Sequence, residues 1–341
     1  MAAQNNAPLP DGLDIAGYRI VKKIASGGFS IVYLAYDGDG NAVAIKEYLP
    51  SALALRQPGE FVPVVAKPHL AVFRIGLKCF FEEGRALARI VHPNVVRVLN
   101  FFRAHETVYM VMAYESGHSL QEHIARAVGK GTPLSEQFVR QVFHGICAGL
   151  REVHANKLLH LDLKPANIYL RTDGSPLLLD FGAARQTIQI DAPMLAPMYT
   201  PGFAAPELYT RGASLGPWTD IYSLGASMLA CMNGSTPQAI DARRAGDKLP
   251  EQLERLQRYY SPELIELVQS CLSLNPLARP QSVFAIQKAL QAKLAKRPSG
   301  TPSSTTSSPP SPTSPPAQEV ETRGGWRGLV DRLGALRRGQ E

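Results

Sequence analysis

Five polar residues in one short stretch could carry out chemistry on a phosphate group. The stretch LLHLDLKPANIYLRTDGSPLLLDFG contains His160, Asp162, Lys164, Asn167 and Asp180. Mg²⁺ prefers oxygen ligands and often takes only one or two from protein, so Asn167 and Asp180 could supply them. Asp162 could orient an attacking hydroxyl or accept its proton, and Lys164 could neutralise the transferred group. A turn-rich loop could hold these residues by chance, but the apolar runs around them favour a site.

A lysine and a glycine turn further upstream suggest a polyphosphate ligand. Lys46 ends the apolar run AVAIK, and the segment SGGFS (residues 26–30, the glycine turn) interrupts a nearly alternating apolar pattern. Such a turn can bring backbone N–H groups close to phosphate oxygens. Glu83 shares a helix face with Leu87 and could fix Lys46. The alternatives are a solvated strand-end charge for Lys46 and a surface ion pair of Glu83 with Arg89.

The elements that would position these residues change character along the chain. Alternating apolar residues predict strands on both sides of the glycine turn, a third strand at 41–49, and two more before residue 115. A three- and four-residue apolar spacing from Phe73 to Val91 predicts a long helix. The part after residue 115 is mostly helix-like. A small sheet domain followed by a helical domain is predicted, with a ligand cleft at the seam.

Composition excludes several classes of protein. The 341 residues are 45% hydrophobic with a net charge of +7, which lacks the dense basic stripe of a dedicated nucleic-acid binder. The four cysteines are scattered without a C-x-x-C pair, so a zinc site or a disulfide framework is not expected. We recognise no signal peptide and no apolar run of about 20 residues. These features predict a cytoplasmic protein that does not bind nucleic acid.

Several ordered motifs resemble those of a protein kinase of the eukaryotic Ser/Thr type, in a bacterial version. The resemblance covers about residues 15–294. Its motifs, in the family's order, are SGGFSIVY, VAIK, FEEGRALARIVHPN, HLDLKPAN, DFG, AAPE, WTDIYSLG and NPLARP. One such motif would be weak evidence, whereas this many in order are highly specific.

The resemblance implies an α+β, bilobal kinase fold, with an antiparallel N-terminal sheet lobe that includes helix C and a mainly helical C-terminal lobe. It also implies the transfer of the γ-phosphate of ATP, with Mg²⁺, to Ser or Thr hydroxyls of proteins, including autophosphorylation, in bacterial signalling. The lysine of DLKPAN and Thr200 point to Ser/Thr acceptors rather than Tyr. Glu207 and Arg279 would form a structural ion pair in the helical lobe.

The resemblance also implies residue roles. Asp162 would be the catalytic base, assisted by Lys164, with Asn167 and Asp180 as metal ligands. Lys46 would hold the α- and β-phosphates, with Glu83 as its partner. The nucleotide would contact Ala25, Ser26, Gly27, Gly28, Val32, Ala44, Lys46, Ala113, Glu115, Ser119 and Tyr169. Ala113 and Glu115 would give adenine its backbone hydrogen bonds.

The expected domain boundaries follow the motifs and the changes in composition. Residues 1–14 would be a loose leader, 15–112 the N-lobe and 113–296 the C-lobe. Residues 297–322 are a Pro/Ser/Thr-rich stretch that should form a disordered linker and a target for autophosphorylation. Residues 323–341 could form a basic amphipathic helix that meets a membrane surface or a partner protein. A disordered basic tail is the equal alternative.

Four departures from the family pattern stand out. Ala25 and Ser30 replace two glycines of the phosphate loop, which we expect to weaken ATP binding. Leu161 replaces an arginine that normally pairs with a phosphate on the activation segment, so we hypothesise that phosphorylation there does not switch this protein on. Residues 49–72 (the insertion) lengthen the connection from Lys46 to Glu83, either as loop ornament or as a partner surface. Tyr169 takes an aliphatic position beneath adenine.

Two other functions fit parts of the pattern. A pseudokinase scaffold would explain the altered glycine turn, but the complete set of catalytic residues argues against it. A small-molecule kinase of the aminoglycoside type would share the Asp/Asn/Asp arrangement, but HPN, AAPE and LARP favour the protein-kinase form. Phosphate transfer to a protein acceptor would separate these alternatives.

Overall fold

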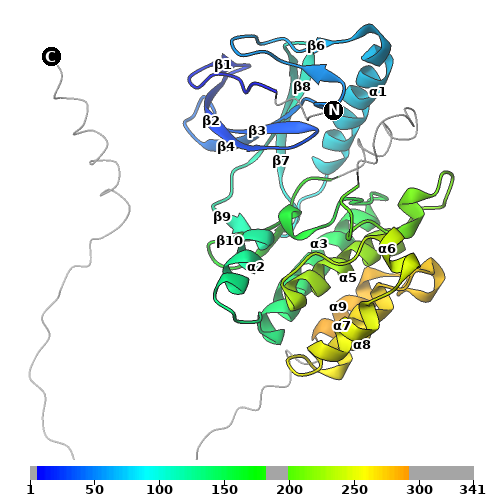
Figure 1. Cartoon of the computed structure of the whole chain (residues 1–341). Helices are drawn as coiled ribbons and strands as arrows, with labels where there is room; N and C mark the ends of the chain where they lie inside the picture. Colours follow the sequence, from blue (N-terminus) through cyan, green and yellow to red (C-terminus); the bar gives the residue numbers. More distant parts are fainter. Residues whose placement is uncertain (1–5, 182–198, 292–341) are drawn as a thin grey trace, which may run out of the picture. The chain divides into compact units, whose positions relative to one another are not determined.

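The computed structural model describes residues 6–181 and 199–291 (Figure 1). The predicted linker at 297–322 and tail helix at 323–341 lie outside these residues, and so does Thr187, a hydroxyl of the activation segment that could accept a phosphate. Within the described residues no helix is long and apolar enough to cross a membrane.

The N-terminal part is built on a six-stranded sheet whose paired strands are all antiparallel, in the order β1-β2-β3-β4-β8-β7. Its strands are β1 (Asp14–Ile15), β2 (Tyr18–Ser26), β3 (Ser30–Tyr36), β4 (Ala42–Tyr48), β7 (Val98–Ala104) and β8 (Thr107–Ala113). Register pairs Val32 with Lys46, so the strand after the glycine turn lies beside the strand that carries the lysine. The strands predicted around the glycine turn are confirmed.

The insertion forms a small hairpin that leads into a helix. Strands β5 (Ala54–Leu55) and β6 (Val64–Val65) pair with each other and not with the main sheet. A 3-10 turn at Lys67–His69 then starts α1 (Leu70–Leu87), which packs on β8. The helix comes so close to β8 that a Cβ on Gly84 would lie 2.9 Å from the Met110 side chain. Its predicted extension to Val91 is wrong, because α1 ends at Leu87 and Val91 is 78% exposed.

The leader is not loose from residue 6 onward. Leu9 is 1% exposed and belongs to the hydrophobic core. Its backbone N–H donates to the Tyr33 hydroxyl at 3.1 Å, and the Ala7 N–H donates to the Arg56 carbonyl at 3.0 Å. The expectation of a loose leader failed because the low apolar content of the segment hid one fully buried leucine.

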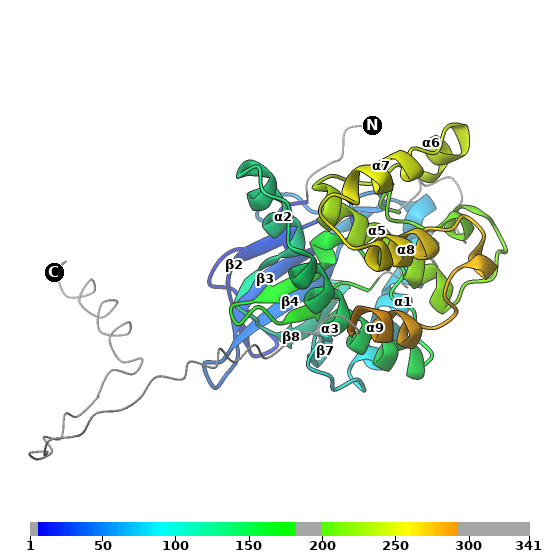
Figure 2. The ribbon, with the colours of Figure 1, turned by 90° about the horizontal axis from the view of Figure 1, so that it is seen from below.

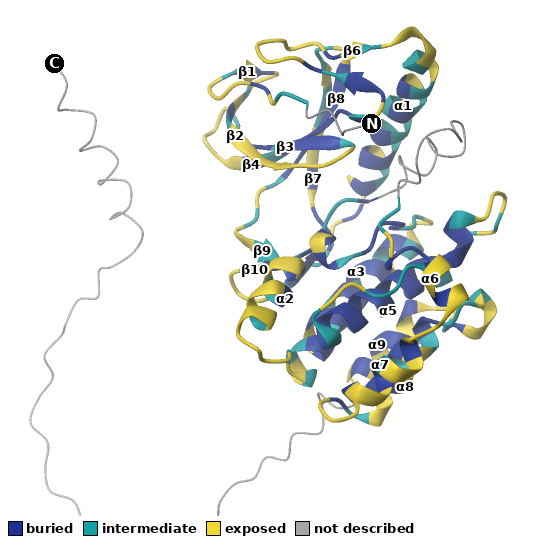
Figure 3. Cartoon of the chain, viewed as in Figure 1, coloured by how far each residue is buried: buried dark blue, intermediate teal, exposed yellow. Residues whose placement is uncertain are grey.

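The C-terminal part is mainly helical and is arranged around α5, which is buried along most of its length (Figure 3). Figure 2 shows α3 and α9 side by side, in agreement with their contacts. The helices are α2 (Leu120–Gly129), α3 (Glu136–Ala155), α5 (Pro217–Asn233), α6 (Ile240–Ala245), α7 (Leu249–Leu256), α8 (Pro262–Cys271) and α9 (Val283–Gln291). Short 3-10 turns occupy Pro165–Asn167, Pro206–Tyr209 and Pro276–Ala278. The sequence analysis did not predict α6, which has six residues, or α7, although Leu249, Leu253 and Leu256 of α7 recur at spacings of four and three.

Helix caps explain why α2 and α3 begin where they do. Ser119 and Glu122 form a reciprocal capping box at the start of α2, with bonds of 3.2 Å and 3.0 Å. The Ser135 hydroxyl caps α3 by accepting from the Phe138 N–H at 3.2 Å. Both caps lie directly before apolar helical patterns, so these helix starts were readable from the sequence.

A separate three-stranded sheet lies in the C-terminal part. Strand β9 (Gly117–Ser119) pairs with β10 (Ile168–Arg171), and β10 pairs with β11 (Pro176–Leu178). Gly117 has a φ of +157°, and a Cβ there would lie 2.0 Å from the Leu170 carbonyl oxygen. Only glycine fits this approach of two backbones. The predicted bilobal α+β fold is confirmed.

Candidate active site

The loop before Asp162 is held by a carboxylate from the centre of the helical part. Asp220 on α5 is fully buried and accepts hydrogen bonds from the backbone N–H groups of His160 and Leu161, each at 2.8 Å. His154 also bonds it, at 2.8 Å. Burial alone would raise the pKa of Asp220, but the bond from His154 and the backbone donors lower that pKa below its usual value. The backbone entering the site is thereby fixed.

His160 and Leu161 are packed into the core rather than turned to solvent. His160 is fully buried, bonds the Leu179 carbonyl through Nε2 at 2.9 Å and stacks on Phe181. Burial lowers the pKa of His160, so the ring is neutral near pH 7. Leu161 is 9% exposed and has a φ of +61°. Its buried apolar side chain cannot pair with a phosphate, in keeping with the hypothesis drawn from the sequence.

Asp162, Lys164, Asn167 and Thr200 form one hydrogen-bonded cluster. Lys164 Nζ lies 3.0 Å from Asp162 Oδ2 and 2.7 Å from the Thr200 hydroxyl. The Thr200 hydroxyl donates to Asp162 Oδ1 at 3.3 Å. Asn167 Nδ2 donates to both the backbone carbonyl and Oδ2 of Asp162, at 2.8 Å and 2.9 Å. The structure therefore brings together the residues predicted to surround the catalytic base.

Lys46, on β4 of the six-stranded sheet, contacts Asp180, whose backbone carbonyl accepts a hydrogen bond from Asn167 of the cluster. Its Nζ forms an ion pair with Asp180 Oδ1 at 2.9 Å and lies 5.7 Å from the centroid of the Phe80 ring. Asp180 has a φ of +50°, in the left-handed region that aspartate adopts more often than most residues other than glycine. Glu83 lies on the buried face of α1 and is 8% exposed. Its pairing with Lys46 stays a prediction.

A cavity of about 370 Å³ opens beside Asp180 and has the size of a small-molecule site. Its lining includes the predicted nucleotide contacts Ala25, Val32, Ala44, Ala113, Glu115, Ser119 and Tyr169. The predicted contacts Ser26, Gly27, Gly28 and Lys46 do not line it. Residues that the sequence reasoning missed are Ile24, Val96, Met112, Tyr114, Gly117, His118, Glu122, Ala166 and Leu179. The apolar ones follow the strand pattern and could have been found, whereas His118 carried no signal.

Tyr169 lines this cavity and contacts residues 112–117 (the hinge), the segment whose Ala113 and Glu115 are expected to hydrogen-bond adenine. Its hydroxyl donates to the Glu115 carbonyl at 3.3 Å. Arg171 also holds Glu115, through an ion pair of 2.9 Å. An aromatic ring in this place can stack against a flat heterocycle, which an aliphatic side chain cannot do.

The glycine turn does not need glycine at its two substituted positions. Neither Ala25 nor Ser30 has a positive φ, and each lies within a strand, although the register of β2 shifts between Lys23 and Ala25. The Gly27 N–H donates to the Ser30 carbonyl at 2.9 Å, which closes the turn. The steric objection to Ala25 and Ser30 is thus removed, although nucleotide affinity itself stays a prediction.

Comparison with known proteins agrees with this geometry. A family model described as the protein kinase domain matches residues 18–294. The chain belongs to the protein kinase family. A structure titled PpkA-294 apo form is 35% identical, covers 83% of this chain and 99% of its own, and superimposes with a TM-score of 0.75.

Several curated relatives are bacterial Ser/Thr kinases. The kinase is 28% identical over 320 residues to the serine/threonine-protein kinase PknD of Chlamydia abortus, covering 84% of this chain and 32% of that protein. It is 30% identical over 276 residues to the probable serine/threonine-protein kinase PkwA of Thermomonospora curvata, covering 78% of this chain and 33% of that protein. The chain therefore spans about a third of the length of these relatives.

The structural ion pair predicted for the helical part of the kinase is confirmed. Arg279 binds Glu207 in a bidentate manner, at 2.7 Å and 3.0 Å, and both side chains are buried. Arg279 also donates to the carbonyls of Ser273 and Trp218. The pair joins the AAPE and LARP motifs, which lie far apart in the sequence.

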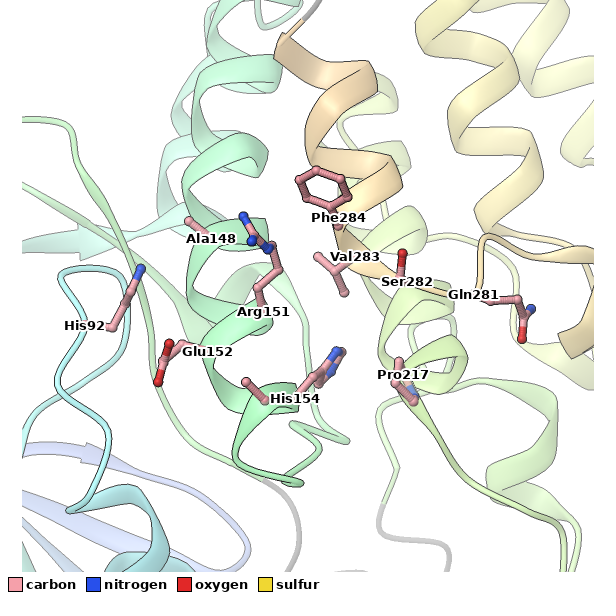
Figure 4. A pocket seen from close by; sticks show the side chains of 11 residues that line it. His92, Ala148, Arg151, Glu152, His154, Pro217, Gln281, Ser282, Val283 and Phe284 are labelled. Carbon is pink, nitrogen blue, oxygen red and sulfur yellow. The ribbon is translucent and has the colours of Figure 1, made fainter.

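A second cavity of about 600 Å³ is lined by residues of α3, the start of α5 and the start of α9 (Figure 4). It lies away from the predicted nucleotide contacts. Arg151 lies 4.9 Å from the centroid of the Phe284 ring and donates to Gln287 at 2.8 Å. None of the predicted catalytic or nucleotide residues lines this cavity. It is larger than the cavity beside Asp180, but it lacks the groups that phosphate transfer needs.

Proposed function

We propose that this kinase transfers the γ-phosphate of ATP to Ser or Thr hydroxyls of proteins. The observation that supports this most directly is the position of the Thr200 hydroxyl, which lies between Asp162 and Lys164. An aliphatic hydroxyl can therefore reach the proposed base and its neighbouring cation at the same time. Membership of the family implies ATP as the phosphate donor and proteins as substrates.

The arrangement fits an in-line displacement. Asp162 orients the acceptor hydroxyl and takes its proton, while the hydroxyl oxygen forms a bond to the γ-phosphorus. The bond from that phosphorus to the β–γ bridging oxygen breaks, and ADP leaves with the electron pair. Lys164 neutralises charge on the transferred group, and Lys46 holds the α- and β-phosphates.

The donor set also fits Mg²⁺, which the family typically uses. Asn167 directs its amide nitrogen at Asp162, so its carbonyl oxygen is turned to the other side. That oxygen and the Asp180 carboxylate are the hard ligands that would hold the ion, with phosphate and water completing its shell. When bound, Mg²⁺ would neutralise charge between the β- and γ-phosphates.

Wider contacts of the kinase are part of the same proposal. The Ser/Thr-rich segment 297–322 would be an autophosphorylation target, and the basic segment 323–341 would contact an anionic membrane or a partner protein from the cytoplasm. Nothing in the described site favours the pseudokinase scaffold.

Labelled ATP with Mg²⁺ would test the proposal, using the full chain and its Asp162→Asn variant. We expect label on Ser or Thr in the wild type and a loss of about 10² to 10⁴-fold in the variant, because the base no longer takes the proton. Equal labelling of both proteins, or label on tyrosine alone, would contradict the proposal. Mapping the labelled sites would show whether residues 297–322 are a target.

A further inference from the structure

The insertion continues the sheet up to the glycine turn. Beyond the end of β4, the Leu49 N–H donates to the Phe29 carbonyl at 2.8 Å and the Ser51 N–H donates to the Gly28 carbonyl at 2.9 Å. The Ser51 hydroxyl donates to the same carbonyl at 3.3 Å. The first residues of the insertion therefore hold the tip of the turn that is expected to lie over the phosphates.

The insertion also binds β4, the strand that carries Lys46. Glu47 follows Lys46, so its side chain points to the opposite face of the sheet, where it is fully buried. Arg56 of the insertion binds both Glu47 carboxylate oxygens, at 2.5 Å and 2.8 Å. The hydroxyls of Tyr33 and Tyr109 donate to the same carboxylate at 2.7 Å and 2.8 Å.

Arg56 is itself fixed by the segment before β1. Its Nε donates to the Ala7 carbonyl at 2.8 Å, and its backbone N–H donates to the Asn6 side chain at 2.7 Å. Arg56 is 1% exposed, whereas its partners Asn6 and Ala7 are partly exposed. The Arg56 guanidinium therefore links the segment before β1, strand β4 and the insertion.

A third contact ties the same strand to α1. Tyr48 packs against Phe73 and Phe80, with ring centroids 5.5 Å and 5.6 Å apart. Phe80 is the ring that lies near Lys46. The contacts within and at the two ends of the insertion therefore hold the glycine turn, β4 and α1 in fixed relative positions.

We propose that the insertion is an internal brace that positions the glycine turn and Lys46 for the nucleotide, with Ser51 and Arg56 as positioning residues. This inference rests on the proposed function, because it assumes that the cavity beside Asp180 takes ATP. A turn and a lysine that are held before binding lose less conformational freedom on binding, which raises affinity. The insertion is neither loop ornament nor, in this role, a partner surface.

A matched pair of variants at Ser51 tests the link to the glycine turn. Pro50 accepts from the N–H groups of Leu53 and Ala54, so Ser51 occupies the second position of a turn, where proline is favoured. Ser51→Pro should remove the N–H donor while keeping the turn, and Ser51→Ala should keep that donor. With the full chain, Mg²⁺ and ATP in a calorimeter, we expect Ser51→Pro to weaken the Kd for ATP by about three- to tenfold. Ser51→Ala should stay within about twofold of the wild type.

A double variant tests the grip on β4. Glu47→Gln with Arg56→Met removes both charges together, so no uncompensated buried charge remains. We expect the melting temperature to stay near that of the wild type while the Kd for ATP weakens about fivefold. The control is Glu136→Gln with Arg140→Met, which removes an ion pair on α3 whose arginine is buried and whose glutamate is 21% exposed. That control should leave the Kd unchanged.

The outcomes separate the brace from the proposed function. A wild-type Kd in both Ser51→Pro and the Glu47/Arg56 double variant would overturn the brace, whatever happens to stability. A Kd that changes equally in the control pair would also overturn it, since the effect would then follow general stability. If the wild type binds ATP but transfers no phosphate, the proposed function fails while the brace is still decided by the Kd values. If the wild type binds no ATP, both fail.

Discussion

Two buried Arg–Glu pairs, one in each part of the fold, are alike in geometry and different in surroundings. In the sheet part, Glu47 receives Arg56 and two tyrosine hydroxyls. In the helical part, Glu207 receives only Arg279 among the described side chains. Arg279 in turn binds two backbone carbonyls and lies 5.0 Å from the centroid of the Tyr222 ring.

The difference concerns the carboxylates. Both arginines also bind backbone carbonyls, but only Glu47 receives further donors, from Tyr33 and Tyr109. A buried charge that loses its partner is costly unless other groups still solvate it. The two pairs should therefore respond differently when the arginine is removed from each.

Removal of the arginines should give the largest effects. Arg279→Met strands the Glu207 carboxylate, and we expect the free energy of unfolding to fall by about 3–5 kcal/mol. Arg56→Met leaves Glu47 with the hydroxyls of Tyr33 and Tyr109, so its loss should lie at or below the lower end of that range. Urea unfolding of both variants provides the measurement. An equal or greater loss for Arg56→Met would show that the two hydroxyls do not solvate the carboxylate.

The tyrosine hydroxyls can be tested one at a time. Tyr109→Phe removes one donor to Glu47 and should lower the free energy of unfolding by about 1.5–3 kcal/mol, since the acceptor is charged. Tyr48→Phe is the control, because its buried hydroxyl has no hydrogen-bond partner in the described part of the chain. That control should be neutral or slightly stabilising. If Tyr48→Phe is destabilised, a change from tyrosine to phenylalanine disturbs this core by itself. The loss in Tyr109→Phe would then not measure the hydrogen bond to Glu47.

A fall in pH should lower the stability of the fold near the Glu47–Arg56 pair before the carboxylates themselves titrate. His105 Nδ1 lies 3.2 Å from the Tyr109 hydroxyl, and burial lowers the pKa of His105 below 6.5. The folded state then binds fewer protons than the unfolded state, so stability is complete above about pH 6.5 and falls as the pH drops below it.

We expect the free energy of unfolding to fall as the pH is lowered from 6.5 to 5, with a contribution from His105, measured by urea unfolding. His105→Asn keeps a residue that tolerates the φ of +50° and should flatten part of the slope. Buried His160 should supply a remaining slope of the same sign, because burial also lowers its pKa. Stability that rises on acidification would contradict the assignment.

The smallest effect should come from a surface pair. Arg19 and Asp14 are 3.1 Å apart, and their side chains are 67% and 64% exposed. Water and salt screen such a pair, so Arg19→Gln should leave the unfolding midpoint unchanged at any ionic strength. A clear shift would mean that exposure is a poor guide to the difference between the two buried pairs.

The two pairs also show what could be predicted from the sequence. Glu207 and Arg279 lie in recognisable motifs, so their contact was expected although 72 positions separate them. Glu47 and Arg56 lie in no motif, and a charged residue beside Lys46 reads as a solvated strand position. Their burial depends on how the hairpin of the insertion folds back over the sheet. Local spacing does not determine such a tertiary contact.

The same contrast holds for the site. Asp162, Asn167 and Asp180 were identified because their types and spacing match one chemistry. The link from Ser51 to Gly28 was not, since it is made by backbone groups and has no side-chain pattern. His118 and Glu122 line the cavity because α2 begins there, which depends on the path of the chain after the hinge.

Gly117 has a mechanical consequence for the kinase. Its close approach to Leu170 anchors the chain to the helical lobe, and β8 anchors it to the sheet lobe up to Ala113. Only Tyr114, Glu115 and Ser116 remain between the two anchors, and Glu115 is held by Tyr169 and Arg171. If the lobes rotate, the backbone of Ala113 must travel with one lobe and that of Glu115 with the other. An adenine that hydrogen-bonds the backbone of both Ala113 and Glu115 would therefore fit at one angle between the lobes. At other angles it would lose one of these hydrogen bonds.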